Sequence, residues 1–342
     1  MRQLATIQKI SNVVHHPNAD ALDICTVLGW KVVTKRDEFK AGDYCVYCEV
    51  DSVLPKRPEF EFLAPRNYRI RTVKLRGEIS QGICFPLSIL GDEYFLGLTS
   101  YGQPYYVEPK IGDEVTDILD IVKYEPPIPA NLGGKVRGNF PSFLFKTDET
   151  RIQSIPEIID TLDGVSMYVT EKLDGSSSTF YLKDGQFGVC SRNWDLDETD
   201  DNSFWRVARR EGIEDKLCQA GINVSIQGEL MGEGVQKNKL GLKDVHFFAF
   251  QVYDIDSGRY YDYDEFVDFC NTFGFKTVPI IDADFKTLGS VDEYVEYVTR
   301  NSSINPSVNA EGFVFRAKTT PSTGRISFKC INPNFLLKYD DA

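Results

Sequence analysis

The sequence contains no apolar run long enough to span a bilayer, and its N-terminus has no charged, apolar and small-residue succession like that of a signal peptide. Internal repeats and low-complexity tails are absent as well. The C-x-x-C motif at Cys45 and Cys48 has no second pair or nearby histidine that would complete a zinc site. We therefore expect no membrane partner and an intracellular, cytoplasmic, reducing location in which the eight cysteines remain thiols.

An excess of positive charge is also missing, since the 342 residues carry a formal net charge of −13. The charge is unevenly distributed. Residues 1–146 contain 18 Lys and Arg against 18 Asp and Glu, whereas residues 147–342 contain 20 against 33. Because local potential rather than total charge steers a polyanion, this composition does not exclude a nucleic-acid substrate, but it argues against tight nonspecific binding.

Turn signals divide residues 1–125 into short segments rich in β-branched and aromatic residues, such as 27–33 and 44–50. Strands at this spacing predict a small β-barrel. The stretch 16–23 resembles part of certain OB-fold tRNA-binding modules. The prolines and glycines of residues 126–140 predict a linker between this OB-like domain and a second domain.

Residues 141–342 show a mixed pattern that predicts an α+β domain of antiparallel sheets flanked by helices. Asp184-Gly185 lies between two strand-like segments and predicts a hairpin turn. Apolar residues at helical spacing predict helices over 264–273, ending at Gly274, and over 291–300. Ser290 and Glu293 have the spacing of a capping box.

The most informative motif is Glu171-Lys172-Leu173-Asp174-Gly175-Ser176. Alone, the K-x-D-G pattern also fits an ordinary hairpin turn. Five further motifs follow it in order: Ser191-Arg192-Asn193, Gln227-Gly228-Glu229, His246-Phe247-Phe248-Ala249-Phe250, Glu311-Gly312-Phe313-Val314-Phe315-Arg316 and Ser327-Phe328-Lys329. The set resembles the covalent nucleotidyltransferases, namely polynucleotide ligases and mRNA capping enzymes. The resemblance implies that Lys172 accepts a nucleotide and that Glu171 and Lys172 contact it.

A free lysine is neutral only about once in a thousand molecules near neutral pH, so a nucleophilic Lys172 requires a cation or burial to lower its pKa. A divalent metal beside the α-phosphate would do this and also neutralise phosphate charge. The carboxylates at the motif positions, Asp174, Glu229 and Glu311, are expected to hold hydrated Mg²⁺ or Mn²⁺. The alternative for each is a solvated carboxylate near a turn.

Cations are expected around the transferred phosphate. Arg192 and Lys329 are the candidates, although relatives often carry K-x-K where this chain has Lys329-Cys330-Ile331. Arg151 is implied beside the nucleotide, with a solvated linker charge as the alternative. By resemblance, Phe250 stacks on the base, and Phe248, on the same face of its strand, is either a second site residue or core.

The branch of the superfamily is indicated by domain order. Only 13 residues follow Lys329, so we expect no OB domain after the last motif and expect the barrel to precede the catalytic domain instead. With Lys146-Thr147-Asp148-Glu149-Thr150-Arg151 and Phe335-Leu336-Leu337-Lys338, this order resembles the Naegleria- and Deinococcus-type RNA ligases. The resemblance implies a monomeric, ATP-dependent RNA ligase that joins 3′-hydroxyl and 5′-phosphate ends through lysyl-AMP and RNA-adenylate, in RNA repair.

Alternatives remain open at this point. One is another covalent nucleotidyltransferase, either a DNA ligase or a guanylyltransferase; another is an RNA-binding protein with an inactive ligase core. Five basic residues, Arg66, Arg69, Arg71, Lys74 and Arg76, are expected to contact either RNA or the β- and γ-phosphates of ATP, or else to protect an edge strand. Strand alternation would divide Arg69 and Arg71 from Lys74 and Arg76.

Overall fold

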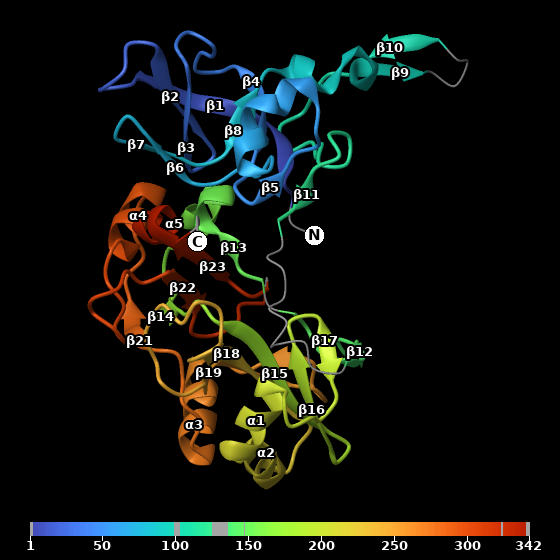
Figure 1. Cartoon of the computed structure of the whole chain (residues 1–342), viewed down its shortest axis with the longest axis vertical. Coiled ribbons are helices and arrows are strands. Elements are labelled where there is room, and N and C mark those ends of the chain that lie inside the picture. Colours follow the sequence, from blue (N-terminus) through green and yellow to red (C-terminus); the bar gives the residue numbers. More distant parts are fainter. Residues whose placement is uncertain (1–2, 99–102, 125–135, 147, 323, 340–342) are drawn as a thin grey trace. The chain divides into compact units, whose positions relative to one another are not determined.

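The computed structural model of the protein describes residues 3–98, 103–124, 136–146, 148–322 and 324–339. The chain divides into two compact units (Figure 1), each described by itself below. The first comprises Met1–Pro126, Gln153–Pro156 and Leu336–Ala342, and the second comprises Pro127–Ile152 and Glu157–Phe335. Most of the predicted linker 126–140 lies outside the described residues. Its end, Val136–Asn139, forms strand β12 of the second unit.

The first unit is built on an antiparallel sheet whose strand order is β3-β2-β1-β4-β8. An irregularity between Ile10 and Asn12 bends β1, so that its first half pairs with β4 and its second half with β2. This bend wraps the sheet into a nearly closed barrel and confirms the predicted OB-like fold. The strands are β1 (Ala5–His15), β2 (Leu22–Val27), β3 (Trp30–Lys35), β4 (Tyr44–Cys48) and β8 (Ile83–Phe85).

The prediction of one strand over residues 27–33 is wrong. The chain turns at Leu28, whose φ of 52° is left-handed, so that β2 and β3 form a hairpin instead. The barrel interior contains Trp30 and Tyr47, both fully buried. Cys45 and Cys48 are buried on β4 as free thiols, and burial raises the pKa of Cys48. The C-x-x-C pair is therefore part of the core.

Short elements complete the first unit. They are the strand pairs β5 (Ser52–Val53) with β11 (Val122–Lys123), β6 (Val73–Leu75) with β7 (Glu78–Ser80) and β9 (Leu96–Leu98) with β10 (Pro104–Tyr106), and the 3₁₀ helices η1 (Pro58–Arg66), η2 (Leu87–Leu90) and η3 (Asp92–Phe95). The ring of His16 contacts the carbonyl of Leu75 at 3.0 Å, and the Asn18 side chain donates to Arg76 O. The stretch around His16 thus holds the β6–β7 hairpin in place.

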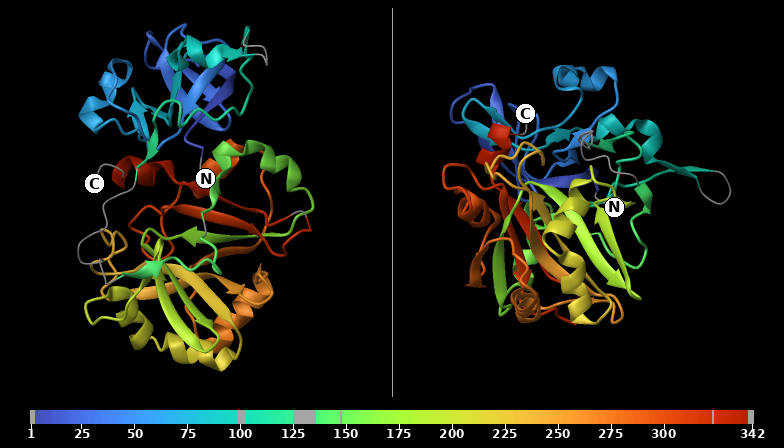
Figure 2. Two further views of the ribbon diagram at one scale, coloured as in Figure 1. Left: turned by 90° about the vertical axis from the view of Figure 1, so that its right-hand side faces the viewer. Right: turned by 60° about the horizontal axis from the view of Figure 1, so that its bottom comes forward.

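The second unit contains two sheets (Figures 1 and 2). One has the order β12-β17-β16-β15-β18-β19-β20. Its strands are β12 (Val136–Asn139), β17 (Trp194–Leu196), β16 (Gln186–Ser191), β15 (Ser176–Lys183), β18 (Val224–Met231), β19 (His246–Asp254) and β20 (Arg259–Tyr260). The other has the order β13-β23-β22-β14-β21, with β13 (Thr150–Arg151), β23 (Ser327–Ile331), β22 (Gly312–Ala317), β14 (Met167–Lys172) and β21 (Ile280–Phe285). Pairing is antiparallel except between β13 and β23, which are parallel.

Helices α1 (Ser203–Arg210), α2 (Ile213–Ala220) and α3 (Tyr263–Phe273) cover the outer face of the seven-stranded sheet, and α4 (Val291–Val298) packs against β23 (Figure 1). Helix α5 (Pro333–Tyr339) and the 3₁₀ helices η5 (Ile152–Ser154) and η6 (Pro156–Thr161) complete the described elements. Gly274 ends α3 as predicted, and Asp184-Gly185 forms the predicted hairpin turn. Ser290 caps α4, but Glu293 reaches back to Gly289 N–H, so the box is shifted by one residue.

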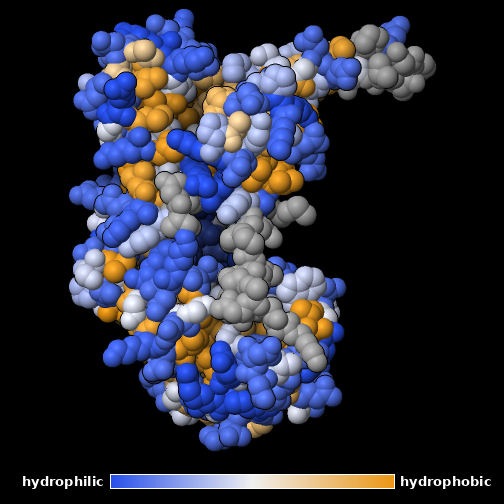
Figure 3. Space-filling view, viewed as in Figure 1, coloured by the Kyte–Doolittle hydropathy of each residue, from blue (hydrophilic) through white to orange (hydrophobic). Residues whose placement is uncertain are grey.

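The apolar side chains of each unit gather inside it. In the second unit one core lies between the large sheet and helices α1–α3, around Phe180 and Phe247. On the face shown in Figure 3, hydrophobic side chains form scattered patches separated by hydrophilic ones. Among the described residues, no helix combines the length and the apolar character needed to cross a membrane.

Candidate active site

Lys172 is the last residue of β14, and its ammonium is close enough to Glu229 of β18 to interact with that carboxylate. It lies opposite Gly312 on β22, which in turn pairs with Ile331 on β23. A Cβ at Gly312 would lie 2.3 Å from Cys330 O, so only glycine allows β22 and β23 to pair closely here. The glycine after Glu311 therefore maintains the strand that supports Lys172.

Three carboxylates surround the Lys172 ammonium. Lys172 Nζ lies 2.5 Å from Glu311 Oε1 in a partly buried ion pair. Glu229 comes from β18 and accepts a hydrogen bond from Gly175 N–H at 3.2 Å, while Asp174 forms an ion pair with Lys239. A Cβ at Gly175 would lie 2.2 Å from Leu230 O. The glycine of the K-x-D-G motif is thus required for the approach of this turn to β18.

The charges of these groups shift one another's pKa. Burial lowers the pKa of Lys172, but the charges of Glu311, Glu229 and Asp174 together outweigh burial, and the pKa lies above its ordinary value. Burial, followed by the neighbouring carboxylates, raises the pKa of Glu229 to about 8 despite the attraction of Lys172. Burial also raises the pKa of Glu311. In this state Lys172 is therefore a protonated ammonium and not yet a nucleophile.

Asp174, Glu229 and Glu311 offer oxygen ligands of the kind that Mg²⁺ and Mn²⁺ prefer. Within the described part of the chain, however, no group of three or more His, Cys, Asp or Glu side chains is arranged to hold a metal ion directly. Glu311 Oε2 is buried and has no hydrogen-bond partner among the described residues, so it has capacity to accept one. The three carboxylates, with the Oε2 atom of Glu311, therefore supply oxygen acceptors that suit a divalent cation or its waters.

The three predicted phosphate-binding cations come together from different elements. Arg151 on β13 lies beside Lys329 on β23 in the parallel register. Arg192 follows β16 in the other sheet, and its Nη2 lies 3.0 Å from Asp148 Oδ2. The second oxygen of Asp148 lies 3.5 Å from Lys329 Nζ. The tertiary fold thus brings Arg192 and Lys329, which are far apart in the sequence, to the two oxygens of Asp148, and Arg151 pairs with Lys329 along the parallel ladder.

Glu171, which is expected to contact the nucleotide, is hydrogen-bonded to a loop of the protein in this structure. Neighbouring strand residues point to opposite faces, and Glu171 is turned away from the face that carries Lys172. Its carboxylate accepts hydrogen bonds from Ser303 N–H at 2.9 Å and from Ser303 Oγ at 2.5 Å. Both bonds are to Oε2 of Glu171, so a nucleotide contact through that oxygen would compete with Ser303. Its observed contacts hold the loop after α4 against β14.

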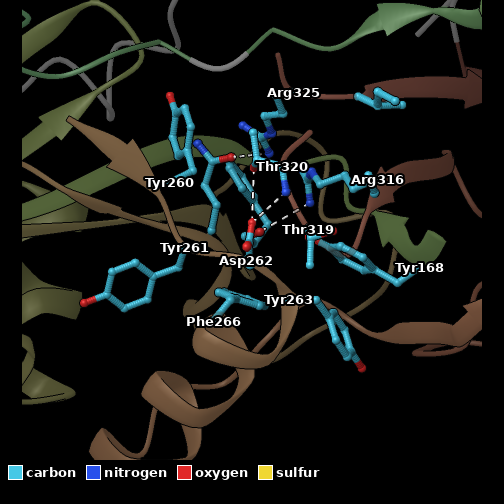
Figure 4. A pocket seen from close by; sticks show the side chains of 14 residues that line it. Tyr168, Tyr260, Tyr261, Asp262, Tyr263, Phe266, Arg316, Thr319, Thr320 and Arg325 are labelled. Atoms are coloured by element: carbon cyan, nitrogen blue, oxygen red, sulfur yellow. Dashed lines mark hydrogen bonds between the residues drawn. The ribbon is translucent and has the colours of Figure 1, made fainter. Parts of the chain in front are cut away.

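Phe250 lies at a bulge of β19, where two residues oppose one residue of β18. Phe248 and Phe250 are both half-buried against the cluster that contains Leu173 and Met231, so they share one face as predicted. Next to Phe250 lies a pocket lined mainly by tyrosines, threonines and two arginines (Figure 4). Lys172 and the three carboxylates do not line it.

The polar groups at that pocket are tied to one another. Arg316 is buried, pairs with Glu149 at 3.1 Å and donates to Phe250 O at 3.3 Å. Arg325 lies 3.7 Å from the same Glu149 oxygen and donates to Gln251 Oε1. Burial would raise the pKa of Glu149, but the charges of Arg316 and Arg325 outweigh burial and lower this pKa below its ordinary value. Glu149 is therefore a charged carboxylate in the folded protein. Arg316 and Arg325 therefore connect the carboxylate of Glu149 to the backbone of β19 at Phe250.

Comparison with known proteins matches this arrangement. Residues 165–331 match the RNA ligase family model, and residues 4–87 match an OB-fold domain model. The structure of Naegleria gruberi RNA ligase with PPi is 36% identical, with a TM-score of 0.89, and the match covers 100% of both chains. The chain belongs to the RNA ligase family.

Other solved structures and one curated protein are similar to parts or all of this RNA ligase family member. A mutant of Naegleria gruberi RNA ligase with ATP and Mn is 35% identical over 99% of this chain and 100% of that chain, with a TM-score of 0.89. Another mutant, with AMP and Mn, is 36% identical over 100% of both chains. The phenylalanine–tRNA ligase beta subunit of Halalkalibacterium halodurans is 31% identical over 113 residues, which are 31% of this chain but only 13% of that protein.

Several residues of this family member's site escaped the sequence analysis. Lys239 pairs with Asp174, and Ser303 holds Glu171, but neither belongs to a motif that could have revealed it. Asp148 and Glu149 lie between Lys146 and Arg151 in the sequence. Two acidic residues between basic ones could have indicated ion pairs at the site. Lys318, which directly follows β22, pairs with Asp284.

The basic run in the first unit is not the continuous strand that alternation required. Strand β6 covers only Val73–Leu75, and Arg76 occupies the turn that follows, with a φ of 46°. Arg69 is buried, pairs with Asp51 at 2.8 Å and lies 3.7 Å from the centre of the Tyr124 ring. Arg69 therefore serves the fold of this unit, whereas Lys74 and Arg76 are exposed.

Proposed function

We propose that the protein is an ATP-dependent RNA ligase that joins an RNA 3′-hydroxyl to a 5′-phosphate and works as a monomer in RNA repair. The observation that carries this proposal is the Lys172 ammonium, 2.5 Å from Glu311 and surrounded by three carboxylates. The full-length similarity to Naegleria gruberi RNA ligase, in structures with ATP or AMP and Mn, supports ATP as the nucleotide and Mg²⁺ or Mn²⁺ as the metal.

The reaction has three steps. Lys172 Nζ loses its proton and attacks the α-phosphorus of ATP, the α–β phosphoanhydride bond breaks, and pyrophosphate leaves. An oxygen of the RNA 5′-phosphate then attacks the lysyl-AMP phosphorus, the P–N bond breaks, and RNA-adenylate forms. Finally the RNA 3′-hydroxyl attacks the 5′-phosphate, and AMP leaves as the strand is sealed. The RNA ends to be joined must therefore carry a 5′-phosphate and a 3′-hydroxyl.

Activation of Lys172 requires a change in the charges around it, because the carboxylates hold its pKa above the ordinary value. Asp174, Glu229 and Glu311 would hold a divalent cation through its waters, because Mg²⁺ gives up its waters reluctantly. Such an ion would supply positive charge beside the lysine and the α-phosphate. Offsetting the carboxylate charge removes the interaction that keeps Lys172 protonated.

The cations and the aromatic side chain bind the rest of the nucleotide. Arg151, Arg192 and Lys329 contact its phosphate, where a planar guanidinium can make two hydrogen bonds at once. Phe250 stacks on the base from the β19 bulge, with its backbone held by Arg316. The seven-stranded sheet therefore supplies Arg192 and Phe250, and the five-stranded sheet supplies the nucleophile and the remaining cations.

Label transfer and sealing test this proposal directly. The purified protein, stripped of bound nucleotide with pyrophosphate, is incubated with α-labelled ATP or GTP and Mg²⁺ or Mn²⁺. We expect label on the protein with ATP only, and sealing of RNA ends but not of an all-DNA nick. Transfer from GTP would indicate a guanylyltransferase, and efficient sealing of an all-DNA nick would indicate a DNA ligase. Failure to label and to seal would leave an RNA-binding protein.

A further inference from the structure

One carboxylate lies between two of the cations that the proposed reaction assigns to phosphate. Asp148 Oδ2 is 3.0 Å from Arg192 Nη2, and Asp148 Oδ1 is 3.5 Å from Lys329 Nζ. Each oxygen therefore faces a different cation, and the two cations come from different sheets of the second unit. Two oxygens of a phosphate group would present the same charge and a comparable spacing to Arg192 and Lys329.

The position of Asp148 is fixed from its C-terminal side. The next residue, Glu149, whose side chain is only 15% exposed, forms an ion pair with buried Arg316. Arg151 then pairs with Lys329 in the parallel ladder, so the segment continues along the edge of the five-stranded sheet. Separating a largely buried carboxylate from its cation costs much free energy, so the Glu149–Arg316 pair restrains the backbone next to Asp148.

A second restraint lies on the N-terminal side. Lys146 Nζ donates to Asn193 Oδ1 at 2.9 Å, and Asn193 O accepts from Phe140 N–H at 3.0 Å. Asn193 directly follows Arg192, so the segment that carries Asp148 is attached to the loop that carries Arg192. The meeting of Asp148 with Arg192 thus depends on the local fold and not on the reach of two long side chains alone.

We propose that Asp148 occupies the place of a nucleotide phosphate in the free protein, and that the incoming phosphate displaces it. This inference rests on the proposed function, because it takes Arg192 and Lys329 as the phosphate contacts. In the free protein, Asp148 keeps the two cations together and lowers their mutual repulsion. When a phosphate arrives, the Asp148 side chain, half-exposed already, rotates into solvent. Asp148 is a positioning residue that competes with the substrate.

The inference predicts an unusual effect, namely that removing a side chain from the site strengthens binding. Asp148→Asn keeps the size of the side chain and removes its charge, and Asp148→Ala removes both. Each variant should bind AMP more tightly than the unsubstituted protein, by roughly 2- to 10-fold, because partly exposed ion pairs are individually weak. Adenosine has no phosphate, so its affinity should not change.

Titration calorimetry with AMP and with adenosine, on protein first treated with pyrophosphate, measures both affinities. Asp160→Asn, which removes an exposed carboxylate on η6, is the matched control and should leave both unchanged. Unchanged or weaker AMP binding in both Asp148 variants, or an equal gain for adenosine, would overturn the inference. If the unsubstituted protein labels itself with ATP in the same experiments, the proposed function stands even so. If it neither labels nor binds AMP, both fail.

Discussion

Each residue of the site has a state that its neighbours impose. Lys172 would be a poor nucleophile as it stands, because the carboxylates beside it raise its pKa more than burial lowers it. Burial and mutual repulsion in turn disfavour the charged form of these carboxylates, as the raised pKa of Glu229 shows. The site therefore places negative charges close together, and a bound cation would reduce the repulsion between them.

Replacing Lys172 tests the identity of the nucleophile. Lys172→Ala has no amine, and the guanidinium of Lys172→Arg stays protonated and cannot attack phosphorus. Both variants should lose transfer of label from α-labelled ATP to protein by several orders of magnitude, measured on denaturing gels. Lys183→Ala, on the hairpin that follows, is the control and should label normally. Undiminished covalent AMP on Lys172→Ala would show that another residue is the nucleophile.

The buried charge of Glu229 predicts a pH-dependent stability. Its pKa of about 8 in the folded protein lies above the ordinary 4.5, so the folded state holds a proton that the unfolded state loses as the pH rises. Folding is therefore weakened progressively between about pH 4.5 and pH 8, by on the order of a few kcal/mol. Glu229→Gln, whose amide oxygen can still accept from Gly175 N–H, should remove this loss.

Thermal melts of the two proteins in excess chelator measure the effect. At pH 8.5 the variant should have the higher Tm, and at pH 5, where Glu229 is protonated, the difference should shrink. The same variant should transfer AMP orders of magnitude more slowly, since it lacks a charge that positions the metal. A Tm difference that is equal at both pH values would contradict a raised pKa for Glu229.

At the scale of elements, the site depends on a buried ion pair and on close backbone approaches. Glu149, just before β13, faces two arginines, Arg316 at 3.1 Å and Arg325 at 3.7 Å. This arrangement links β13 to β22 and, through Phe250 O, to β19. Residues that touch no nucleotide thus determine where Asp148, Arg151 and Phe250 lie.

Glu149→Gln should therefore destabilise the protein, by about 3–5 kcal/mol, because it leaves two arginines without their carboxylate. The pKa of Glu149 is lowered in the folded state, so its contribution is present above its ordinary pKa and is lost as the pH falls through the lowered value. The Tm difference from the unsubstituted protein should be large at pH 7 and smaller near pH 4. Glu157→Gln on η6, which is exposed, is the control and should melt normally.

Gly175 predicts a second effect at this scale. A Cβ there would lie 2.2 Å from Leu230 O and 2.4 Å from Met231 Sδ, so Gly175→Ala must push the turn after Lys172 away from β18. We expect a lower Tm and a rate of AMP transfer reduced by more than tenfold. Gly138→Ala on β12 is the matched control, since no atom lies within 4 Å of its Cβ. Equal behaviour of the two variants would show that the close approach is not required.

At the scale of the whole molecule, the first unit carries two exposed basic residues, Lys74 and Arg76. We expect them to contact phosphate groups, either of ATP or of RNA. Lys74→Gln/Arg76→Gln tests them without disturbing buried Arg69. We expect slower lysyl-AMP formation, by several-fold, with normal sealing of pre-adenylated RNA. Loss of sealing that disappears at low salt would instead place these residues on the RNA backbone. Lys9→Gln/Lys40→Gln is the control pair.

Local patterns determined much of this fold. Strand-like segments on either side of Asp184-Gly185 located β15 and β16, helical spacing located α3 and α4, and the glycines at 185 and 274 marked a hairpin and a helix end. These signals are local because a strand or helix places neighbouring residues by its own period. They failed at Leu28, where a turn is formed by a residue that rarely adopts a positive φ, and over residues 69–76, where alternation suggested a strand longer than β6.

The order of the motifs was likewise enough to predict that Lys172, Glu229 and Glu311 belong to one site, because transfer of a nucleotide to a lysine needs an amine and carboxylates close together. Only the tertiary structure decided that Asp148 lies between Arg192 and Lys329, that Glu171 turns away to Ser303, and that Lys239 pairs with Asp174. Those contacts join separate strands and loops across two sheets. No period along the chain encodes them, since they depend on which strands become neighbours and in which register.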